Sequence, residues 1–172
     1  MATRDDDIKN NSIKQLVTFV VNEEEYGLEI LKVQEVVRLP HITRLPKSPV
    51  FIKGVINLRG NIIPIIDLRE KFGLEALAYT EITRVIIIEI SEKRVGMIVD
   101  NVSQVVRVEE SSIAPPPPMI SGITDQYVSG VVRLEDRLII MLKVEDILST
   151  EEVVQLEQAN LEQFKEAVVE SR

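Results

Sequence analysis

The sequence predicts a mainly β protein that contains two similar β units and ends in a helix. Segments rich in Val and Ile alternate with turn residues along most of the chain, which is typical of short strands. An internal duplication relates the two halves, and a helix-capping pattern follows the second copy. Hydrophobic residues make up 45% of the 172 residues and aromatic residues only 4%, so aliphatic side chains must provide most of the core.

The duplication consists of two pairs of segments that align without gaps. Gly54 aligns with Gly130 at an offset of 76 residues, and Gly27 aligns with Gly96 at an offset of 69. The difference of seven residues is a longer connection in the second half, which contains Pro115–Pro118. Short apolar strands can resemble one another by chance, but a gapless register across turns and glycines is harder to obtain from composition alone. The repeat therefore predicts two similar structural units. The aligned segments are Leu16–Leu28 with Val85–Met97, and Gly54–Ile66 with Gly130–Leu142.

In the first half, strands are predicted at Leu16–Val21 and Tyr26–Glu29, joined by the acidic turn Asn22–Glu25. Ile30–Val37 is ambiguous, because its apolar residues have helical spacing whereas the aligned segment of the second half follows a turn signal and resembles a strand. Ser48-Pro49 is expected to open a short helical turn that runs to the first glycine of the next element.

Gly54–Leu68 is predicted to form a hairpin of two short apolar strands. Gly60-Asn61 supplies the turn, because Gly and Asn tolerate a positive φ. Arg59 is then expected at the tip, held out by an apolar scaffold as a contact residue would be. Pro64 cannot donate to a β-ladder, so its strand is expected at a sheet edge or with a bulge. Apolar side chains on both faces predict a closed or doubly covered sheet.

Leu68–Phe72 is expected to form one helical turn that Gly73 stops, and the same order of elements repeats from Arg84 to Leu148. These two copies divide the domain, residues 15–148, into subdomains at roughly 15–80 and 81–148.

The two ends of the chain differ from this pattern. Residues 1–14 carry too little apolar surface to offset ordering and are expected to form a disordered tail. Ser149 and Glu152 match a capping box, which predicts a helix from Glu151 to about Val169 within the C-terminal segment 149–172. The apolar stripe of this helix is expected to face the core, with a partner helix as the alternative.

Charge and composition exclude several classes of partner. The net charge is −8 with a pI near 4.8, and no basic stripe is present, which argues against binding of nucleic acid or anionic membranes. The absence of cysteine excludes disulfides and thiolate chemistry. The polar, acidic N-terminus is no signal peptide, and no apolar run approaches the roughly 18 residues of a membrane span. We therefore expect a soluble cytoplasmic protein without direct membrane insertion.

Residues suited to catalysis or metal binding are scarce. His41 is the single histidine, so neither a cluster of His and Cys ligands nor a Ser-His-Asp arrangement is predicted. No glycine-rich phosphate loop is present. Glu35 and Asp67 could form a carboxylate pair, but charged residues beside strands are more often solvated. Pro115–Pro118 is expected to be a stiff surface loop rather than a polyproline ligand. The sequence predicts a non-enzyme without cofactor or metal.

Three runs of the sequence closely resemble the CheW family of chemotaxis coupling proteins. They are Tyr26–Val36, Phe51–Gly60 and Ile63–Arg69, and the resemblance continues through Val95–Val102. It covers nearly everything from about residue 16 to residue 147, and the Asn-Leu-Arg-Gly motif at 57–60 is its most specific part. The four-proline run departs from the family, which usually has fewer prolines there.

The resemblance implies two intertwined, pseudo-symmetric five-stranded SH3-like β-barrels with short helices and a C-terminal helix. It implies a non-catalytic adaptor, recruited to membrane-associated signalling arrays. The expected partners are the regulatory domain of the histidine kinase CheA and the helical hairpin at the cytoplasmic tip of methyl-accepting chemoreceptors, which lies in the groove between the barrels. The positions that match partner-facing residues of the family are Val33, Glu35, Val36, Gly54, Asn57, Leu58, Arg59, Gly60, Gly96 and Val102.

Several alternatives stay open at this point. The resemblance does not separate the residues that meet the receptor from those that meet the kinase, and Val33 and Val36 are equally compatible with an ordinary core. A stand-alone regulatory CheW-like domain of another kinase pathway would have the same fold. A small nucleic-acid-binding barrel is disfavoured, because it would need basic and aromatic strand faces.

Overall fold

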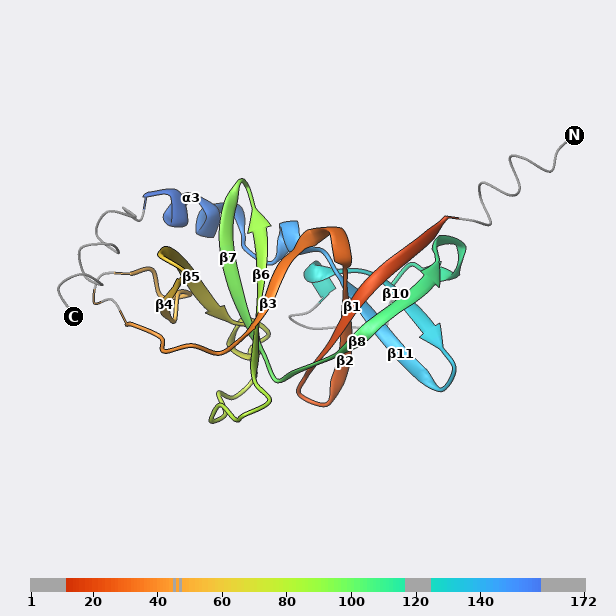
Figure 1. Cartoon of the computed structure of the whole chain (residues 1–172). Coiled ribbons are helices and arrows are strands. Elements are labelled where there is room, and N and C mark those ends of the chain that lie inside the picture. Colours follow the sequence, from red (N-terminus) through yellow and green to blue (C-terminus); the bar gives the residue numbers. More distant parts are fainter. Residues whose placement is uncertain (1–11, 45, 47, 117–124, 159–172) are drawn as a thin grey trace, which may run out of the picture.

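The computed structural model describes residues 12–44, 46, 48–116 and 125–158 and consists of two curled antiparallel-rich sheets placed side by side (Figure 1). Sheet A has the strand order β8-β1-β2-β11-β10-β9, and sheet B has the order β3-β6-β7-β5-β4. The strands of sheet A are β1 (Ile13–Val21), β2 (Glu24–Glu29), β8 (Asn101–Glu109), β9 (Ile113–Ala114), β10 (Val128–Leu134) and β11 (Arg137–Leu142). Those of sheet B are β3 (Val33–Arg38), β4 (Gly54–Leu58), β5 (Asn61–Asp67), β6 (Arg84–Ile90) and β7 (Lys93–Val99).

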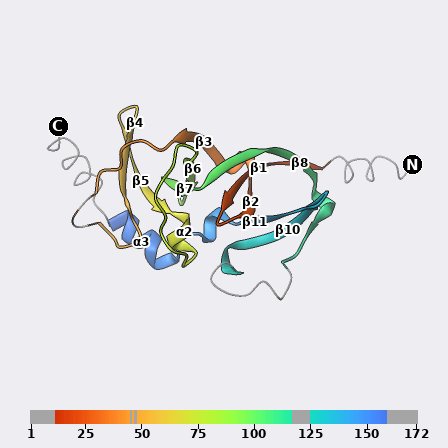
Figure 2. The same cartoon turned by 90° about the horizontal axis from the view of Figure 1, so that it is seen from below.

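The helices are short and lie between strands or at the end of the described chain. In Figures 1 and 2, α3 lies beside sheet B, at the opposite side from the start of β1. The helices are η1 (Ile30–Lys32), α2 (Leu68–Lys71), η2 (Glu110–Ser112), η3 (Asp125–Tyr127), η4 (Val144–Asp146) and α3 (Thr150–Gln158). The predicted mainly β class with two related units is confirmed, and sheet A gains a sixth, two-residue strand, β9.

Each sheet combines strands from both copies of the repeat. Sheet A contains the β1–β2 hairpin of the first copy with β8, β10 and β11 of the second, and sheet B contains the reverse combination. The boundaries of the expected subdomains, roughly 15–80 and 81–148, therefore do not coincide with the two sheets, which are intertwined. Equivalent hairpins have the same apolar pattern and backbone groups, so the repeat alone does not specify which copy a hairpin joins.

The exchange leaves the two sheets with the same topology and register. β2 pairs in parallel with β11 through Gly27 and Met141, and β7 pairs in parallel with β5 through the aligned residues Gly96 and Ile65. The ladders β1–β8 and β6–β3 each contain an irregularity at the same aligned position. Each sheet curls, so that its own two edges approach each other. In sheet A, β9 pairs with β10, and in sheet B a bridge joins Thr43 to Val55 of β4.

The position of Pro64 differs from the prediction of an edge strand. β5 lies inside sheet B, between β7 and β4, and Pro64 is opposite Val55 of β4. The ladder to β7 begins only at Ile65, so the proline lies just outside the part of β5 that is paired on both sides. A proline is tolerated there because no donor is required on the β7 side.

Three apolar clusters form the core. One lies within sheet A and includes Leu16 and Ile139, and one lies within sheet B and includes Ile63 and Ile87. The third and largest, which we call the central cluster, takes residues from β1, β2, β5, β6 and β7 and from α2 and α3. It contains a row of four of the seven aromatic residues, with ring centroids 5.3–5.9 Å apart between Phe19, Tyr26, Phe72 and Tyr127. The sheets therefore bury their facing surfaces against each other.

The predicted hairpin turns are present, but the turn between β4 and β5 lies one residue earlier than predicted. The β4–β5 loop is Arg59-Gly60 rather than Gly60-Asn61, with φ of 52° and 85°, and Asn61 already belongs to β5. Glu135 occupies the aligned position of the β10–β11 loop with φ of 55°, so both residues lie at hairpin tips as the alignment predicts. The positive φ is thus a property of the shared turn.

The remaining local predictions are mostly confirmed. The ambiguous segment Ile30–Val37 contains both a helical turn, η1, and a strand, β3, one after the other. α2 ends before Gly73, which has a φ of 75°. The capping box is present, with Ser149 and Glu152 exchanging hydrogen bonds of 2.9 and 3.1 Å. The predicted disordered tail, residues 1–14, extends too far, because β1 already begins at Ile13 and Ile13 pairs with β8. Residues 1–11, Pro117, Pro118 and the predicted helix beyond 158 lie outside the described residues.

Candidate functional site

Glu35 and Arg59 are brought together across the two edges of sheet B. β3 carries Glu35, the turn after β4 carries Arg59, and these strands stand at opposite ends of the strand order. The guanidinium donates from Nη1 to Oε1 at 2.9 Å and from Nη2 to Oε2 at 2.5 Å. The arginine side chain remains 65% exposed and the glutamate 28% exposed. This bidentate pair fixes the guanidinium in an accessible position.

Neighbouring polar groups surround the pair. The Asn57 Oδ1 accepts a hydrogen bond of 2.9 Å from the Gly60 backbone N–H, which braces the turn below Arg59. On the other side, Arg94 Nε donates to Gln34 Oε1 at 2.9 Å, next to Glu35. The hydrogen bonds from Arg59 hold the pKa of Glu35 below its ordinary value, and the charge of Arg94 acts in the same direction. The site keeps its ion pair throughout the neutral range.

Arg94 and Gln34 were not found by the sequence analysis. They are 60 residues apart in the chain, and only the ladder β3–β6–β7 brings them together. Their residue types carry no motif, and a charged residue two positions after a hairpin turn is ordinarily solvated. No local pattern could have identified them.

The aligned positions of sheet A carry different chemistry. Gln104 replaces Glu35 on β8, and Glu135 replaces Arg59 at the β10–β11 tip. With its amide oxygen turned towards the guanidinium, Gln104 accepts from Arg137 at 2.6 and 2.9 Å. Arg137 also pairs with Glu25 at 3.1 Å. In both sheets an arginine thus links an edge strand, β3 or β8, to the aligned hairpin, but only sheet B places the arginine at the exposed tip.

The predicted valines separate into two groups. Val33 and its aligned partner Val102 are half-buried and pack against the central cluster, so they belong mainly to the contact between the sheets. Val36 is exposed, and so is its aligned partner Val105. Leu58, like the aligned Leu134, is half-buried beside the core of its own sheet.

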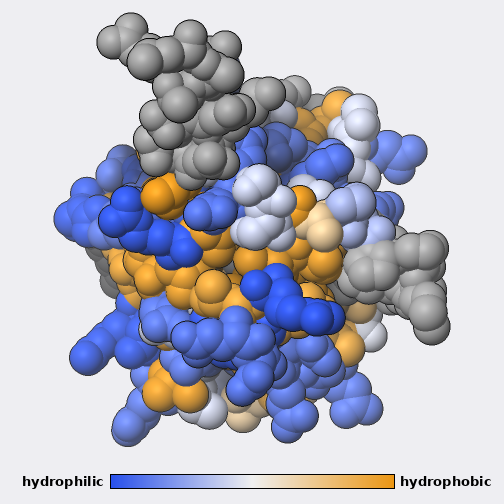
Figure 3. All heavy atoms as spheres, turned by 90° about the vertical axis from the view of Figure 1, so that its right-hand side faces the viewer, coloured by the Kyte–Doolittle hydropathy of each residue, from blue (hydrophilic) through white to orange (hydrophobic). Residues whose placement is uncertain are grey.

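Exposed apolar surface occurs on both sheets. Figure 3 shows the face at the sheet A end of the molecule, where a band of hydrophobic residues runs between hydrophilic ones. Apolar exposure by itself therefore does not single out one site. What distinguishes sheet B is the combination of Val36 with the Glu35–Arg59 pair.

Gly54 and Gly96 lie inside sheet B. Both are buried, and a Cβ on Gly96 would lie 2.4 Å from Ile65 Cδ1 and 2.8 Å from Val85 Cγ1. A Cβ on Gly54 would lie 2.4 Å from the carbonyl oxygen of Thr43, where the chain after β3 bridges to β4. Each position serves close packing inside sheet B, so neither offers a side chain at the surface, and their part in partner binding stays a prediction.

The aligned glycines of sheet A are also closely packed, though less tightly. A Cβ on Gly27 would lie 3.0 Å from Ile139 Cγ2, and one on Gly130 would lie 2.7 Å from the carbonyl oxygen of Ala114. The four positions therefore serve the shared fold in both copies.

The described residues offer little for catalysis. Within ranges 12–44, 46, 48–116 and 125–158, no group of three or more His, Cys, Asp or Glu side chains is placed to hold a metal ion. Asp67 and Glu35 do not form a carboxylate pair. Asp67 is buried and accepts from Tyr79 Oη at 3.0 Å and from the Arg69 backbone N–H at 2.9 Å, whereas Glu35 binds Arg59.

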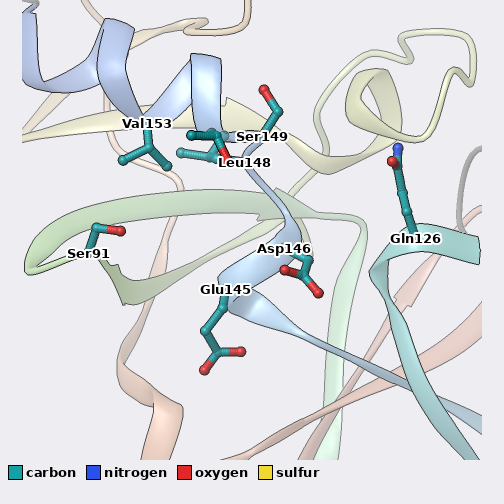
Figure 4. A pocket seen from close by; sticks show the side chains of 8 residues that line it. Ser91, Gln126, Glu145, Asp146, Leu148, Ser149 and Val153 are labelled. Atoms are coloured by element: carbon teal, nitrogen blue, oxygen red, sulfur yellow. The ribbon is translucent and has the colours of Figure 1, made fainter.

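A cavity of about 500 Å³ lies between the β6–β7 turn, η4 and the start of α3 (Figure 4). Its lining side chains do not converge, since Glu145 points away from Leu148 and Ser149 in Figure 4. Glu145 is already paired with Lys32 at 2.8 Å. Nothing in this arrangement resembles an active site.

No helix in the described part of the chain is both long and apolar enough to cross a bilayer.

Comparisons with known proteins agree with this architecture. The family model of the CheW-like domain matches residues 15–152. The chain is 41% identical over 140 residues to the chemotaxis protein CheW of Klebsiella aerogenes, which covers 81% of this chain and 84% of that protein. It is 35% identical over 138 residues to the CheW of Bacillus subtilis, covering 80% and 88% of the two chains.

A solved structure gives the same result for the fold. The crystal structure of the scaffolding protein TtCheW from Thermoanaerobacter tengcongensis superimposes with a TM-score of 0.73 at 42% sequence identity, covering 81% of this chain and 90% of that chain. The predicted resemblance is confirmed by sequence and by structure, and the chain belongs to the CheW-like domain family.

Proposed function

We propose that this chain is a non-catalytic cytoplasmic adaptor that couples chemoreceptor tips to the histidine kinase CheA in membrane-associated arrays. Membership of the CheW-like family supports the proposal, as do the names of its relatives, which are chemotaxis proteins and a scaffolding protein. The proposed partners are the helical hairpin of a methyl-accepting chemoreceptor and the regulatory domain of CheA. Neither contact requires a cofactor.

The Glu35–Arg59 pair is the observation that carries the site. A guanidinium has five N–H donors, and two are used on Glu35, so others are left for a partner. The carboxylate holds the side chain in one orientation before a partner arrives, which lowers the entropy cost of binding. Arginine is also among the residues most often found at interface hot spots.

Apolar surface beside the pair completes the proposed contact. Val36 follows Glu35 on β3 and is 37% exposed, and Asn57 of β4 and Gly60 of the turn are exposed near Arg59 in the chain. An apolar patch with a directional charged group at its edge is the usual composition of a specific protein interface. A helix could lay its apolar face on this surface and place a carboxylate or backbone carbonyl on Arg59.

The test is a pull-down with a receptor cytoplasmic fragment and CheA, run separately and together. The wild-type chain is expected to retain both proteins and to form the ternary complex. Arg59→Ala is expected to weaken ternary assembly about tenfold, which corresponds to loss of one charged hot-spot contact. Its free energy of unfolding in urea should differ from that of the wild type by no more than about 0.5 kcal/mol, because the side chain is exposed.

Glu135→Ala is the matched control, because Glu135 has the aligned position and the same positive φ. It should leave ternary assembly unchanged. Equal losses in the two variants, or unfolding of Arg59→Ala, would show that the tip is structural. Failure of the wild-type chain to retain either protein would favour a regulatory CheW-like domain of another kinase pathway.

A further inference from the structure

A second cavity lies between two connections of sheet B, and neither Glu35 nor Arg59 is among its described lining residues. Its volume is about 460 Å³. One wall comes from the connection between β3 and β4, and the other from the connection between α2 and β6. The lining residues are Leu39, Pro40, His41, Ile42, Arg44, Lys53, Ala76, Leu77, Ala78 and Tyr79.

The charge of this cavity is opposite to that of the whole protein. None of the ten described lining residues is acidic, whereas Arg44, Lys53 and His41 are basic, and the chain as a whole carries −8. Lys53 is already paired with Glu70 at 2.9 Å. Arg44 is exposed and its charge acts on Tyr79 of the opposite wall, but it makes no hydrogen bond or ion pair with another described residue. The cavity therefore presents one available guanidinium.

Apolar side chains form the rest of the lining. Leu39 and Ile42 are half-buried and pack against the sheet B cluster, so they give a fixed apolar floor. Leu77 on the opposite wall is 55% exposed. An exposed leucine that faces a half-buried apolar floor across a cavity is a place where an apolar side chain of a ligand would gain burial.

Tyr79 anchors the second wall. Its hydroxyl donates to the Asp67 Oδ2 at 3.0 Å, and Asp67 is 4% exposed. Asp67 also caps α2 by accepting from the Arg69 backbone N–H. Burial and the carboxylate of Asp67 raise the pKa of Tyr79, so the hydroxyl stays protonated and keeps donating. The wall is thus tied to the interior of sheet B.

The second copy of the repeat shows that this arrangement is not needed for the fold. The position aligned with Asp67 is Lys143. Thr43, which bridges to β4, corresponds to Ala114 of β9, so the residue that corresponds to Arg44 is Pro115. The polar anchor and the available guanidinium therefore belong to the first copy alone.

We propose that this cavity binds a short extended segment of a partner protein that carries an aliphatic side chain beside a carboxylate. The aliphatic side chain would lie between Ile42 and Leu77, and the carboxylate would pair with Arg44. Charge complementarity with an arginine in a lining free of acids selects an acidic ligand. This surface is distinct from the Glu35–Arg59 site and does not depend on the function proposed for that site.

The experiment uses the ¹⁵N-labelled full chain and the peptide acetyl-Gly-Glu-Leu-Asp-Gly-amide. We expect amide shift changes confined to residues 39–44 and 76–79, with saturation in the millimolar range. The analogue with Gln and Asn in place of Glu and Asp should bind about tenfold more weakly, as should the wild-type peptide to Arg44→Glu. Leu77→Ser should weaken binding to a similar degree.

Two control variants separate these effects from general changes in the surface. Ile82→Ser removes a side chain of the same connection that is 54% exposed but does not line the cavity. Arg133→Glu makes the same charge change as Arg44→Glu on sheet A, at an exposed position. Both should bind the peptide as the wild type does. Absence of shifts at about 5 mM peptide, shifts elsewhere, or equal binding of the neutral analogue would overturn the proposal.

Discussion

Sheet A and sheet B share their strand order, their register and their hairpin turns, yet different side chains link the edge strand to the aligned hairpin in each sheet. In sheet B a glutamate and a tip arginine form a bidentate pair, and in sheet A a glutamine binds an arginine two positions further along, below an acidic tip. Crowded glycines occur in both sheets. Features common to both copies therefore belong to the fold, and the features that differ are the candidates for function.

The largest expected effect concerns the central cluster that both sheets share. Phe72→Ala should lower the free energy of unfolding by about 3–5 kcal/mol, because the ring is buried between Tyr26 and Tyr127. Since each sheet takes strands from both copies, the amides of sheets A and B should lose hydrogen-exchange protection together. Loss confined to one sheet would show that the sheets are independent.

The aligned glycines allow a comparison of packing in the two sheets. Gly96→Val should cost about 3 kcal/mol, because three side chains already lie within 3.3 Å of the position of its Cβ. Gly27→Val should cost about 1 kcal/mol, because the nearest atom lies at 3.0 Å and can yield more easily. Urea unfolding of both variants measures the difference. A larger loss for Gly27→Val would contradict the packing described for the two sheets.

Exchange of the charges in the Glu35–Arg59 pair sharpens the comparison between the two tips. Arg59→Glu reproduces the second copy, where Glu135 tolerates the same positive φ, so the fold should persist. Each single charge reversal should weaken ternary assembly with receptor and CheA about tenfold. The double variant Glu35→Arg with Arg59→Glu should keep an ion pair between the two positions but should not regain ternary assembly with receptor and CheA. If it regains assembly, the pair acts only as a structural link.

The smallest expected effect is the titration of Glu35. Its pKa is lowered in the folded chain by the hydrogen bonds of Arg59, so the pair stabilises the fold above the ordinary value near 4.5 and this contribution is lost as the pH falls through the lowered pKa. In Arg59→Ala the pKa of Glu35 should rise towards its ordinary value, as measured by ¹³C NMR of the carboxyl group. Gln104, at the aligned position, supplies no titrating group, so only sheet B should show this pH dependence. An unchanged pKa in the variant would mean that the pair does not persist in solution.

The local elements and the family could be predicted from the sequence. The capping box of Ser149 and Glu152, the helical turn before Gly73 and the tip positions of Arg59 and Glu135 follow from interactions within a few residues. The duplication and the Asn-Leu-Arg-Gly motif at 57–60 were visible as patterns, because aligned residues keep their types in sequence whatever their positions in space.

The tertiary structure alone decided which copy each hairpin joins and which predicted site residues reach the surface. Gly54 and Gly96 carry no side chain whose chemistry could indicate burial, and only the neighbouring strands show that they are enclosed. The pairing of Glu35 with Arg59 needs the two edges of sheet B to meet, which the exchange of hairpins and the burial of the central cluster bring about. These arrangements depend on contacts between residues far apart in the chain, and local patterns do not encode such contacts.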